Sequence, residues 1–205
     1  MDLQTEITKD LLEIEAVQIR TENYFTWTSG IKSPIYCDNR LTMSYPHVRR
    51  KIVKAFTERI ERLGWKPDSI AGCATAGIPH AAWLAEALDL PMVYVRSSPK
   101  GHGKENQIEG HINREDRVIV IEDLISTGGS SLEAVRVLKE VGAEVLGVLA
   151  IFTYGLEKAK NNFSEENVAV STITSYDFLL EMLMNEEKIT EAEKNELIAW
   201  RDLLK

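Results

Sequence analysis

Between residues 70 and 152 the sequence alternates short apolar runs with stretches of helical spacing. The apolar runs, which predict strands, are residues 70–73, 92–95, 118–121 and 145–152, and residues 78–88 and 130–141 predict helices between them. Strands separated by helices predict an α/β fold whose central, mostly parallel sheet is flanked by helices. Ligands of such sheets bind beyond the carboxyl ends of the strands, which are here the segments after Cys73, Val95 and Ile121.

The flanking regions predict further helices and a hairpin. Leu3, Ile7, Leu11 and Ile14 recur at helical spacing, and a second helix is predicted from Tyr45 to Leu63 with Gly64 as its cap. Residues 23–40, rich in aromatic and turn-forming residues, predict an exposed hairpin. The last thirty residues read as helical, with Thr190 and Glu193 spaced as a capping box. We expect a single domain over residues 1–205, with the N-terminal helix and hairpin at about 1–45, the core sheet at about 65–155 and C-terminal helices at about 172–205.

Composition narrows the class of protein. Hydrophobic residues make up 44% and charged residues 27% of the 205 residues, as in ordinary soluble globular proteins. The longest apolar run is far below the roughly 18 residues of a membrane span, and the acidic N-terminus does not resemble a secretory signal. Two cysteines in unrelated contexts predict no disulfide framework. We therefore expect a cytoplasmic protein that binds neither membranes nor, given its net charge of −8, nucleic acid.

The stretch "VIVIEDLISTGGS", residues 118–130, predicts a strand, two acids, a loop of small residues and a helix start. Backbone N–H groups at a helix start have no partners within the helix, so they form an anion site that the helix dipole strengthens by up to about 2 kcal/mol. Ser126, Thr127 and Ser130 add hydroxyl donors, and Gly128 and Gly129 allow close approach. This loop is suited to a phosphate group.

Glu122 and Asp123 would repel a phosphate ligand unless that ligand also carried donors or a cation. Sugar hydroxyls are donors, and Mg²⁺ prefers carboxylate and phosphate oxygens. The pairing predicts a sugar phosphate whose ribose hydroxyls face the two acids. We expect Mg²⁺ as a cofactor that bridges ligand oxygens, and we predict no set of dedicated metal-ligand residues.

All thirteen residues of this stretch resemble the signature of the type I phosphoribosyltransferases. The resemblance implies that family's fold, with an N-terminal hood hairpin over the sheet, and a site for phosphoribosyl pyrophosphate. It implies that the loop holds the 5′-phosphate and that the acids bind the ribose hydroxyls. The implied donor-binding residues are Arg96, Lys100, His102, Glu122, Asp123, Leu124, Ile125, Ser126, Thr127, Gly128, Gly129 and Ser130.

Two other stretches resemble the orotate phosphoribosyltransferases. The hairpin "FTWTSGIKSPIYCDNR" is similar to that family's hood and carries a lysine, Lys32, in the turn that covers the base. The segment "RSSPKGHGKENQIEG", residues 96–110, resembles the family's catalytic loop, which closes over the diphosphate of an adjacent subunit's substrate. The turn "CATAGIP" corresponds to its second phosphate loop. Because "IFTYGLEKA" lacks an arginine that binds the orotate carboxylate in some members, we expect Ser126, with Lys32, to recognise orotate.

The resemblance implies transfer of ribose 5-phosphate from phosphoribosyl pyrophosphate to orotate, giving orotidine monophosphate and pyrophosphate. Lys100, His102 and Asp123 are the implied catalytic residues, acting through position and charge rather than through a covalent nucleophile. Excluding water from the closed loop strengthens its charges, because a charge pair about 4 Å apart is worth about 1 kcal/mol in water but about 4 kcal/mol at a dielectric of 20. A loop that acts across subunits implies a homodimer with shared active sites.

Two alternatives remain open at this point. One is a purine-type phosphoribosyltransferase, against which the hood lysine argues. The other is a regulator that senses phosphoribosyl pyrophosphate and binds nucleic acid, which should show a basic patch. His47, His80 and His111 are interpreted as structural or exposed, and Cys37 and Cys73 as neither redox-active nor nucleophilic.

Overall fold

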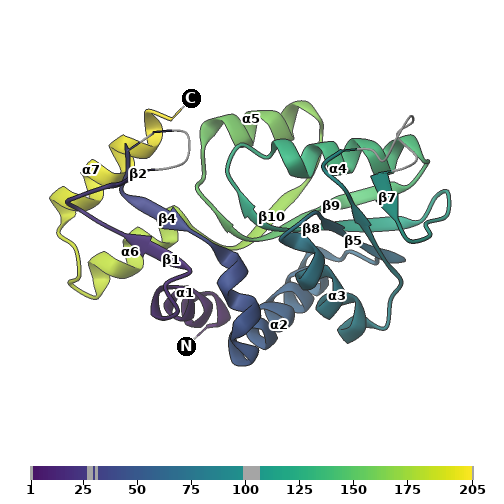
Figure 1. Cartoon of the computed structure of the whole chain (residues 1–205), viewed down its shortest axis with the longest axis horizontal. Helices are drawn as coiled ribbons and strands as arrows, with labels where there is room; N and C mark the ends of the chain where they lie inside the picture. The colour runs from purple at the N-terminus through teal and green to yellow at the C-terminus, as the bar shows by residue number, and fades with distance from the viewer. Residues whose placement is uncertain (1, 27–29, 31, 99–106, 205) are drawn as a thin grey trace.

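The computed structural model describes residues 2–26, 30, 32–98 and 107–204, and over these residues its centre is a six-stranded sheet in the order β10-β9-β8-β5-β6-β7 (Figure 1). Neighbouring strands from β10 to β6 pair in parallel, and only the edge strand β7 runs antiparallel to β6. The mostly parallel sheet predicted from the alternating pattern is therefore confirmed. The strands are β5 (Ser69–Cys73), β6 (Met92–Val95), β7 (Ile108–Glu109), β8 (Arg117–Ile125), β9 (Glu144–Thr153) and β10 (Val170–Ser175).

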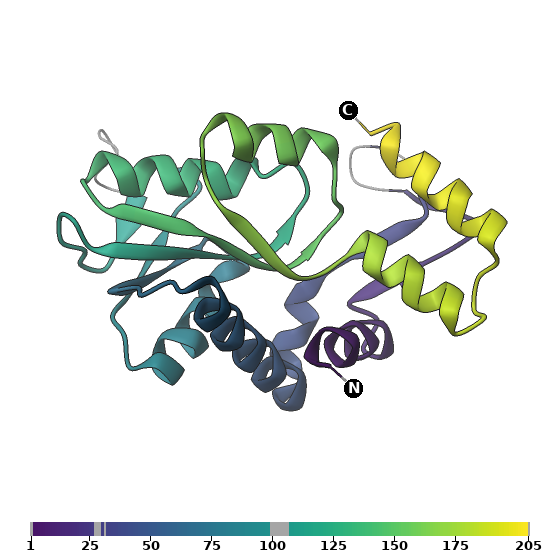
Figure 2. The same cartoon turned by 180° about the vertical axis from the view of Figure 1, so that it is seen from behind.

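Helices cover both faces of this sheet (Figures 1 and 2). One face carries α1 (Leu3–Glu13), α2 (Pro46–Leu63) and α3 (Gly77–Leu88), and the other carries α4 (Gly129–Glu140) and α5 (Glu157–Glu165). The central strand β8 shows why two layers are needed. Its Ile119 and Ile121 pack in one hydrophobic cluster and its Val118 and Val120 in the other, and all four are fully buried. Alternation along a strand that is apolar on both faces produces this double core.

The predicted hood is a pair of two-stranded antiparallel sheets beside the core. β1 (Val17–Ile19) pairs with β4 (Ile35–Cys37), and β2 (Phe25–Thr26) pairs with β3 (Lys32–Ser33), which confirms the hairpin. The helical turn η1 (Asn39–Ser44) then leads from the hood into α2. At the other end of the chain, α6 (Tyr176–Asn185) and α7 (Glu191–Asp202) lie beside the hood, and the predicted capping box of Thr190 and Glu193 is present.

Five elements are absent from the sequence predictions: β1, η1, β7, α5 and β10. β10 reads "VSTITS" because it is an edge strand that buries only part of its surface, so its pattern is mixed rather than apolar. Residues 172–175 consequently belong to this strand and not to the C-terminal helices. α5 buries only Ala159 and Phe163, too few to produce a helical stripe. Over the described part of the chain, no helix combines the length and the apolar character that crossing a membrane requires.

Candidate active site

The acid pair lies within β8 rather than in the loop that follows it. Glu122 pairs with Ala150 of β9, and the strand continues through Leu124 and Ile125, which pair with Phe152 and Thr153. Glu122 is buried, and its Oε1 accepts a hydrogen bond from the backbone N–H of Asp123 at 3.0 Å. The sheet therefore fixes both carboxyl groups before the loop begins.

The environment of the two acids raises the pKa of both carboxyl groups. Burial raises the pKa of Glu122, and the neighbouring Asp123 raises it further. Burial is also the largest cause that raises the pKa of Asp123. Among the described residues, no lysine or arginine forms an ion pair with either carboxyl group. The pair is thus suited to a ligand that brings hydroxyl donors or a cation to this position.

The loop after β8 presents a helix start without a side-chain cap. Gly128 adopts φ +79° as the N-cap of α4, and the N–H of Leu132 makes the first helical hydrogen bond to the Gly128 carbonyl. No side chain caps the first N–H groups, and Ser126, Gly129 and Ser130 are exposed. The amide of Asn162 in α5 donates to the Thr127 carbonyl at 2.9 Å and holds the loop from behind. These features form the predicted anion site.

A pocket of about 230 Å³ brings this loop together with the ends of β5 and β6. It is lined by Cys73, Ala74, Val95, Arg96, Ser97, Gly129, Ser130, Glu133 and Ala134. Arg96 forms an ion pair with Glu109 at 3.3 Å. The Ala74–Thr75 peptide bond, in the turn resembling a second phosphate loop, is cis. The ends of β5 and β6 and the start of α4 thus meet at one pocket, at the carboxyl edge of the sheet where ligands of parallel sheets bind.

The two residues that flank the middle of the basic segment, Arg96 and Gln107, are hydrogen-bonded to each other. The N–H of Arg96 donates to the Gln107 carbonyl at 2.8 Å, and the Gln107 amide donates back to the Arg96 carbonyl at 3.2 Å. Lys100 and His102, which the resemblance implies to be catalytic, lie outside the described residues. Lys32 is exposed in β3, where its Nζ donates to Thr26 Oγ1 at 2.7 Å across the hairpin.

The other histidines and the cysteines fit structural or exposed places. Burial lowers the pKa of His80 to about 4, so it stays neutral, and its Nε2 lies 3.3 Å from Thr42 Oγ1. His111 is exposed, and its Nε2 forms a hydrogen bond with Asn113 Oδ1 at 3.1 Å. Burial raises the pKa of both thiols, Cys37 and Cys73, which is the opposite of what a nucleophile requires.

Asn39 is a site residue that sequence reasoning missed. It begins η1 and is fully buried, and its Nδ2 donates to the Asp123 carbonyl at 2.8 Å. The backbone carbonyl of Asn39 accepts a hydrogen bond from Thr42 Oγ1 at 2.6 Å. Because 84 residues separate Asn39 from Asp123, no local pattern could reveal this contact. η1 therefore holds the backbone of the acid pair from the hood side.

Comparisons with known proteins agree with this geometry. Residues 44–177 match the family model of the phosphoribosyl transferase domain. The chain is 60% identical to the orotate phosphoribosyltransferase of Oceanobacillus iheyensis over 98% of this chain and 100% of that protein, and 54% identical to that of Listeria innocua over 98% and 96%. Its fold is similar to the crystal structure of orotate phosphoribosyltransferase from Aeropyrum pernix, with a TM-score of 0.76, 29% identity and coverage of 86% of this chain and 97% of that one.

Proposed function

This chain belongs to the orotate phosphoribosyltransferases, which transfer ribose 5-phosphate from phosphoribosyl pyrophosphate to orotate in pyrimidine biosynthesis, and we propose that the carboxyl end of β8 holds the donor. One observation carries this assignment. An acid pair fixed by the sheet lies near the end of β8, and three residues separate the end of that strand from the uncapped start of α4. A sugar hydroxyl site and a phosphate site are therefore adjacent, in the order in which ribose 5-phosphate presents these groups.

Each part of the site is assigned one part of the donor. Ser126, Thr127, Gly128, Gly129 and Ser130 bind the 5′-phosphate through N–H and hydroxyl groups, while Leu124 and Ile125 contribute the strand end beneath the sugar. Glu122 and Asp123 accept hydrogen bonds from the ribose hydroxyls. Arg96, with Lys100 and His102 from the segment outside the described residues, meets the diphosphate.

Catalysis on this assignment depends on charge and position. As the bond between C1′ and the diphosphate loosens, positive charge develops on the ribose ring and negative charge on the leaving pyrophosphate. The carboxylate of Asp123 stabilises the ribose side, and Lys100 and His102 stabilise the leaving group. Lys32 and Ser126 orient orotate so that its ring nitrogen faces C1′.

Mg²⁺ is the proposed cofactor, and the acid pair fits it. Two buried carboxyl groups without an ion-pair partner among the described residues offer the hard oxygen donors that this ion prefers. The described residues contain no cluster of three or more histidine, cysteine or acidic side chains, so the remaining ligands would come from the substrate, as is usual for Mg²⁺. When bound, the ion supplies charge neutralisation for the diphosphate.

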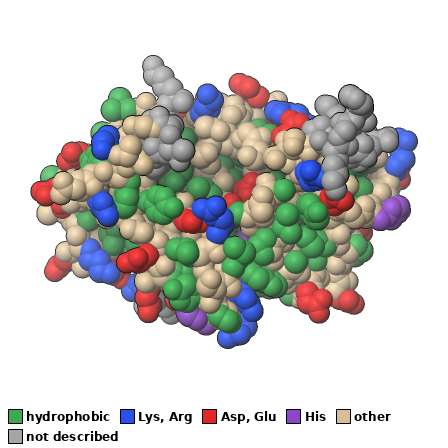
Figure 3. All heavy atoms as spheres, viewed as in Figure 1, with side chains coloured by type: hydrophobic (Ala, Val, Ile, Leu, Met, Phe, Trp, Pro, Cys, Tyr) green, Lys and Arg blue, Asp and Glu red, His purple; other side chains and the backbone are tan. Residues whose placement is uncertain are grey.

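A homodimer is proposed from an apolar surface next to the site. Tyr36, Leu41, Met43 and Tyr45 leave between 37% and 39% of their surface exposed, and they gather around η1. A groove of about 380 Å³ between α2 and α3, with Arg49 stacked on Trp83, lies on the same helical layer. Figure 3 shows hydrophobic side chains gathered over the middle of the face where these elements lie. A second copy of this chain covering η1 would sit directly against the element that holds Asp123.

The reaction is tested by following orotate absorbance with phosphoribosyl pyrophosphate and Mg²⁺. Turnover of orotate, but not of hypoxanthine or xanthine, is expected. Turnover of a purine base alone would move the chain to the purine-type alternative. Salt-dependent nucleic-acid binding without any turnover would favour the sensing regulator.

The shared site is tested by mixing two inactive chains, Lys100→Ala and Asp123→Asn. If Lys100 acts on the partner's substrate, each mixed dimer has one intact site, and roughly a quarter of wild-type activity returns because half of the dimers are mixed. Chains carrying different affinity tags show whether mixed dimers form. Mixed dimers that form and stay inactive would contradict the shared site.

A further inference from the structure

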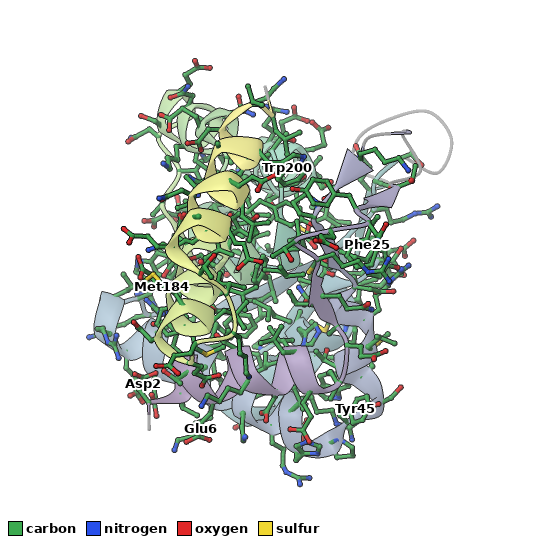
Figure 4. All side chains as sticks on the ribbon, turned by 90° about the vertical axis from the view of Figure 1, so that its left-hand side faces the viewer. Asp2, Glu6, Phe25, Tyr45, Met184 and Trp200 are labelled. Carbon is green, nitrogen blue, oxygen red and sulfur yellow. The ribbon has the colours of Figure 1, made fainter. Side chains whose placement is uncertain are left out.

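One face of α7 contacts the hood hairpin at three successive positions. Glu193 interacts electrostatically with the Thr21 side chain, and Glu196 with the Tyr24 hydroxyl, whose pKa it raises after the larger effect of burial. The indole Nε1 of Trp200 donates to the backbone carbonyl of Lys32 at 3.0 Å. Spacings of three and four residues place the three α7 side chains on a single helix face. Figure 4 shows Trp200 on the side of α7 that faces the hairpin carrying Phe25.

The rest of α7 is anchored to the body of the protein. Leu197 is buried in the main hydrophobic cluster, and its carbonyl accepts from the Tyr176 hydroxyl at 3.2 Å. Arg201 pairs with Asp177 at the start of α6. Because α6 follows β10 directly, these contacts fix α7 relative to the central sheet. The hairpin that α7 contacts is thereby fixed relative to the sheet as well.

Both partners in this contact lie outside the shared domain. The phosphoribosyl transferase domain matches residues 44–177, whereas the hairpin precedes residue 44 and α7 begins at Glu191. The shared domain holds the donor site at the end of β8. The contact between the hairpin and α7 therefore belongs to the part of the chain that can distinguish one acceptor base from another.

We propose that Trp200 is a positioning residue for orotate, acting through Lys32. Its N–H fixes the carbonyl of Lys32, while the side chain of Lys32 is held across the hairpin by Thr26. The strand is thus fixed at the hood residue whose side chain is assigned to the base. This inference rests on the role of Lys32 given under the proposed function.

The first test compares Trp200→Phe with Trp65→Phe. Trp200→Phe keeps an aromatic ring and removes the N–H donor, so KM for orotate should rise about fivefold, within the range for loss of one hydrogen bond. KM for phosphoribosyl pyrophosphate and kcat should stay within about twofold, because the donor site is on β8. Trp65 packs against Gly147 of β9, away from the hairpin, so its variant controls for the general loss of an indole. Equal changes in both KM values, or no change relative to Trp65→Phe, would overturn the proposal.

A double-mutant cycle with Lys32→Ala tests whether the effect passes through Lys32. Lys32→Ala keeps the carbonyl that Trp200 binds but removes the side chain that meets the base, so Trp200→Phe should add less than about twofold to KM for orotate in that background. Fully additive effects would refute the positioning role. Lys32→Ala with wild-type kinetics would instead remove the role of Lys32, while turnover by the wild type would still support the reaction.

If Trp200→Phe does not fold, Tyr24→Phe tests the same face by removing the hydroxyl that interacts with Glu196. It should raise KM for orotate selectively. A thermal unfolding midpoint equal to that of the wild type would show that the KM effect is not a loss of folded protein. Unchanged kinetics in a folded Tyr24→Phe protein would overturn the role of the α7 face.

Discussion

Gly128 joins the anion loop to the layer behind it, and its replacement should be costly for two separable reasons. At φ +79°, the left-handed conformation costs an alanine about 1–2 kcal/mol relative to glycine. Its Cβ would also lie 2.5 Å from Cε2 of the buried Phe163, and such overpacking costs about 1–3 kcal/mol. Gly128→Ala should therefore lower the free energy of unfolding by about 2–5 kcal/mol, and the midpoint by about 5–15 °C for a chain of this size.

Urea and thermal unfolding of Gly128→Ala and Gly129→Ala measure this difference directly. Gly129 is the matched control because a Cβ there meets only Thr127 Oγ1, at 3.9 Å, and alanine is favoured inside a helix. In a Phe163→Leu background the packing part of the Gly128→Ala cost should disappear, leaving about 1–2 kcal/mol from the backbone. Equal stability of Gly128→Ala and Gly129→Ala, or a cost that Phe163→Leu does not reduce, would refute this reasoning.

Two further predictions concern the acid pair. Because burial raises the pKa of Glu122 in the folded chain, its proton stabilises the fold fully below the ordinary carboxyl pKa of about 4.3, and this stabilisation is lost as pH rises through the raised folded value. The unfolding free energy of Glu122→Gln relative to wild type should therefore increase with pH in urea titrations; a pH-independent difference would contradict the raised pKa. Asn39→Leu should cost about 1–3 kcal/mol by leaving the Asp123 carbonyl without its donor and should raise KM for phosphoribosyl pyrophosphate, whereas Asn195→Leu on the exposed side of α7 should change stability by less than about 0.5 kcal/mol. Equal stability losses in the two asparagine variants would argue against the Asn39 contact.

The core of the fold was predictable because its signals are local. The apolar runs of β5, β8 and β9 are largely buried on both faces, and that of β6 is buried on one face and half-buried on the other, so each reads as a strand without knowledge of its neighbours. The end of β8 was not predictable in this way. The predicted strand ends at Ile121, before the two acids, but the pairing of Leu124 with Phe152 extends it past Glu122 and Asp123. Where a strand ends depends on its partner, which the local sequence does not contain.

The candidate site likewise has parts that the local sequence predicts and parts that depend on contacts between distant residues. The anion loop was visible because its serines, threonine and glycines are consecutive and precede a helix. The contacts of Asn39 with Asp123 and of Trp200 with Lys32 join residues 84 and 168 positions apart. Neither residue has a motif of its own, and only the folded chain brings each to its partner.

The hydrogen bonds between Arg96 and Gln107 also determine how much the length of the segment between them can vary without destabilising the sheet. These bonds join the two residues that flank residues 97–106. The sheet therefore constrains where that segment begins and ends, but not its length. By chain entropy alone, doubling the ten residues between these two positions costs only about 0.6 kcal/mol. The length of this segment can therefore diverge among descendants of this chain, or be redesigned in the laboratory, with little effect on the stability of the sheet.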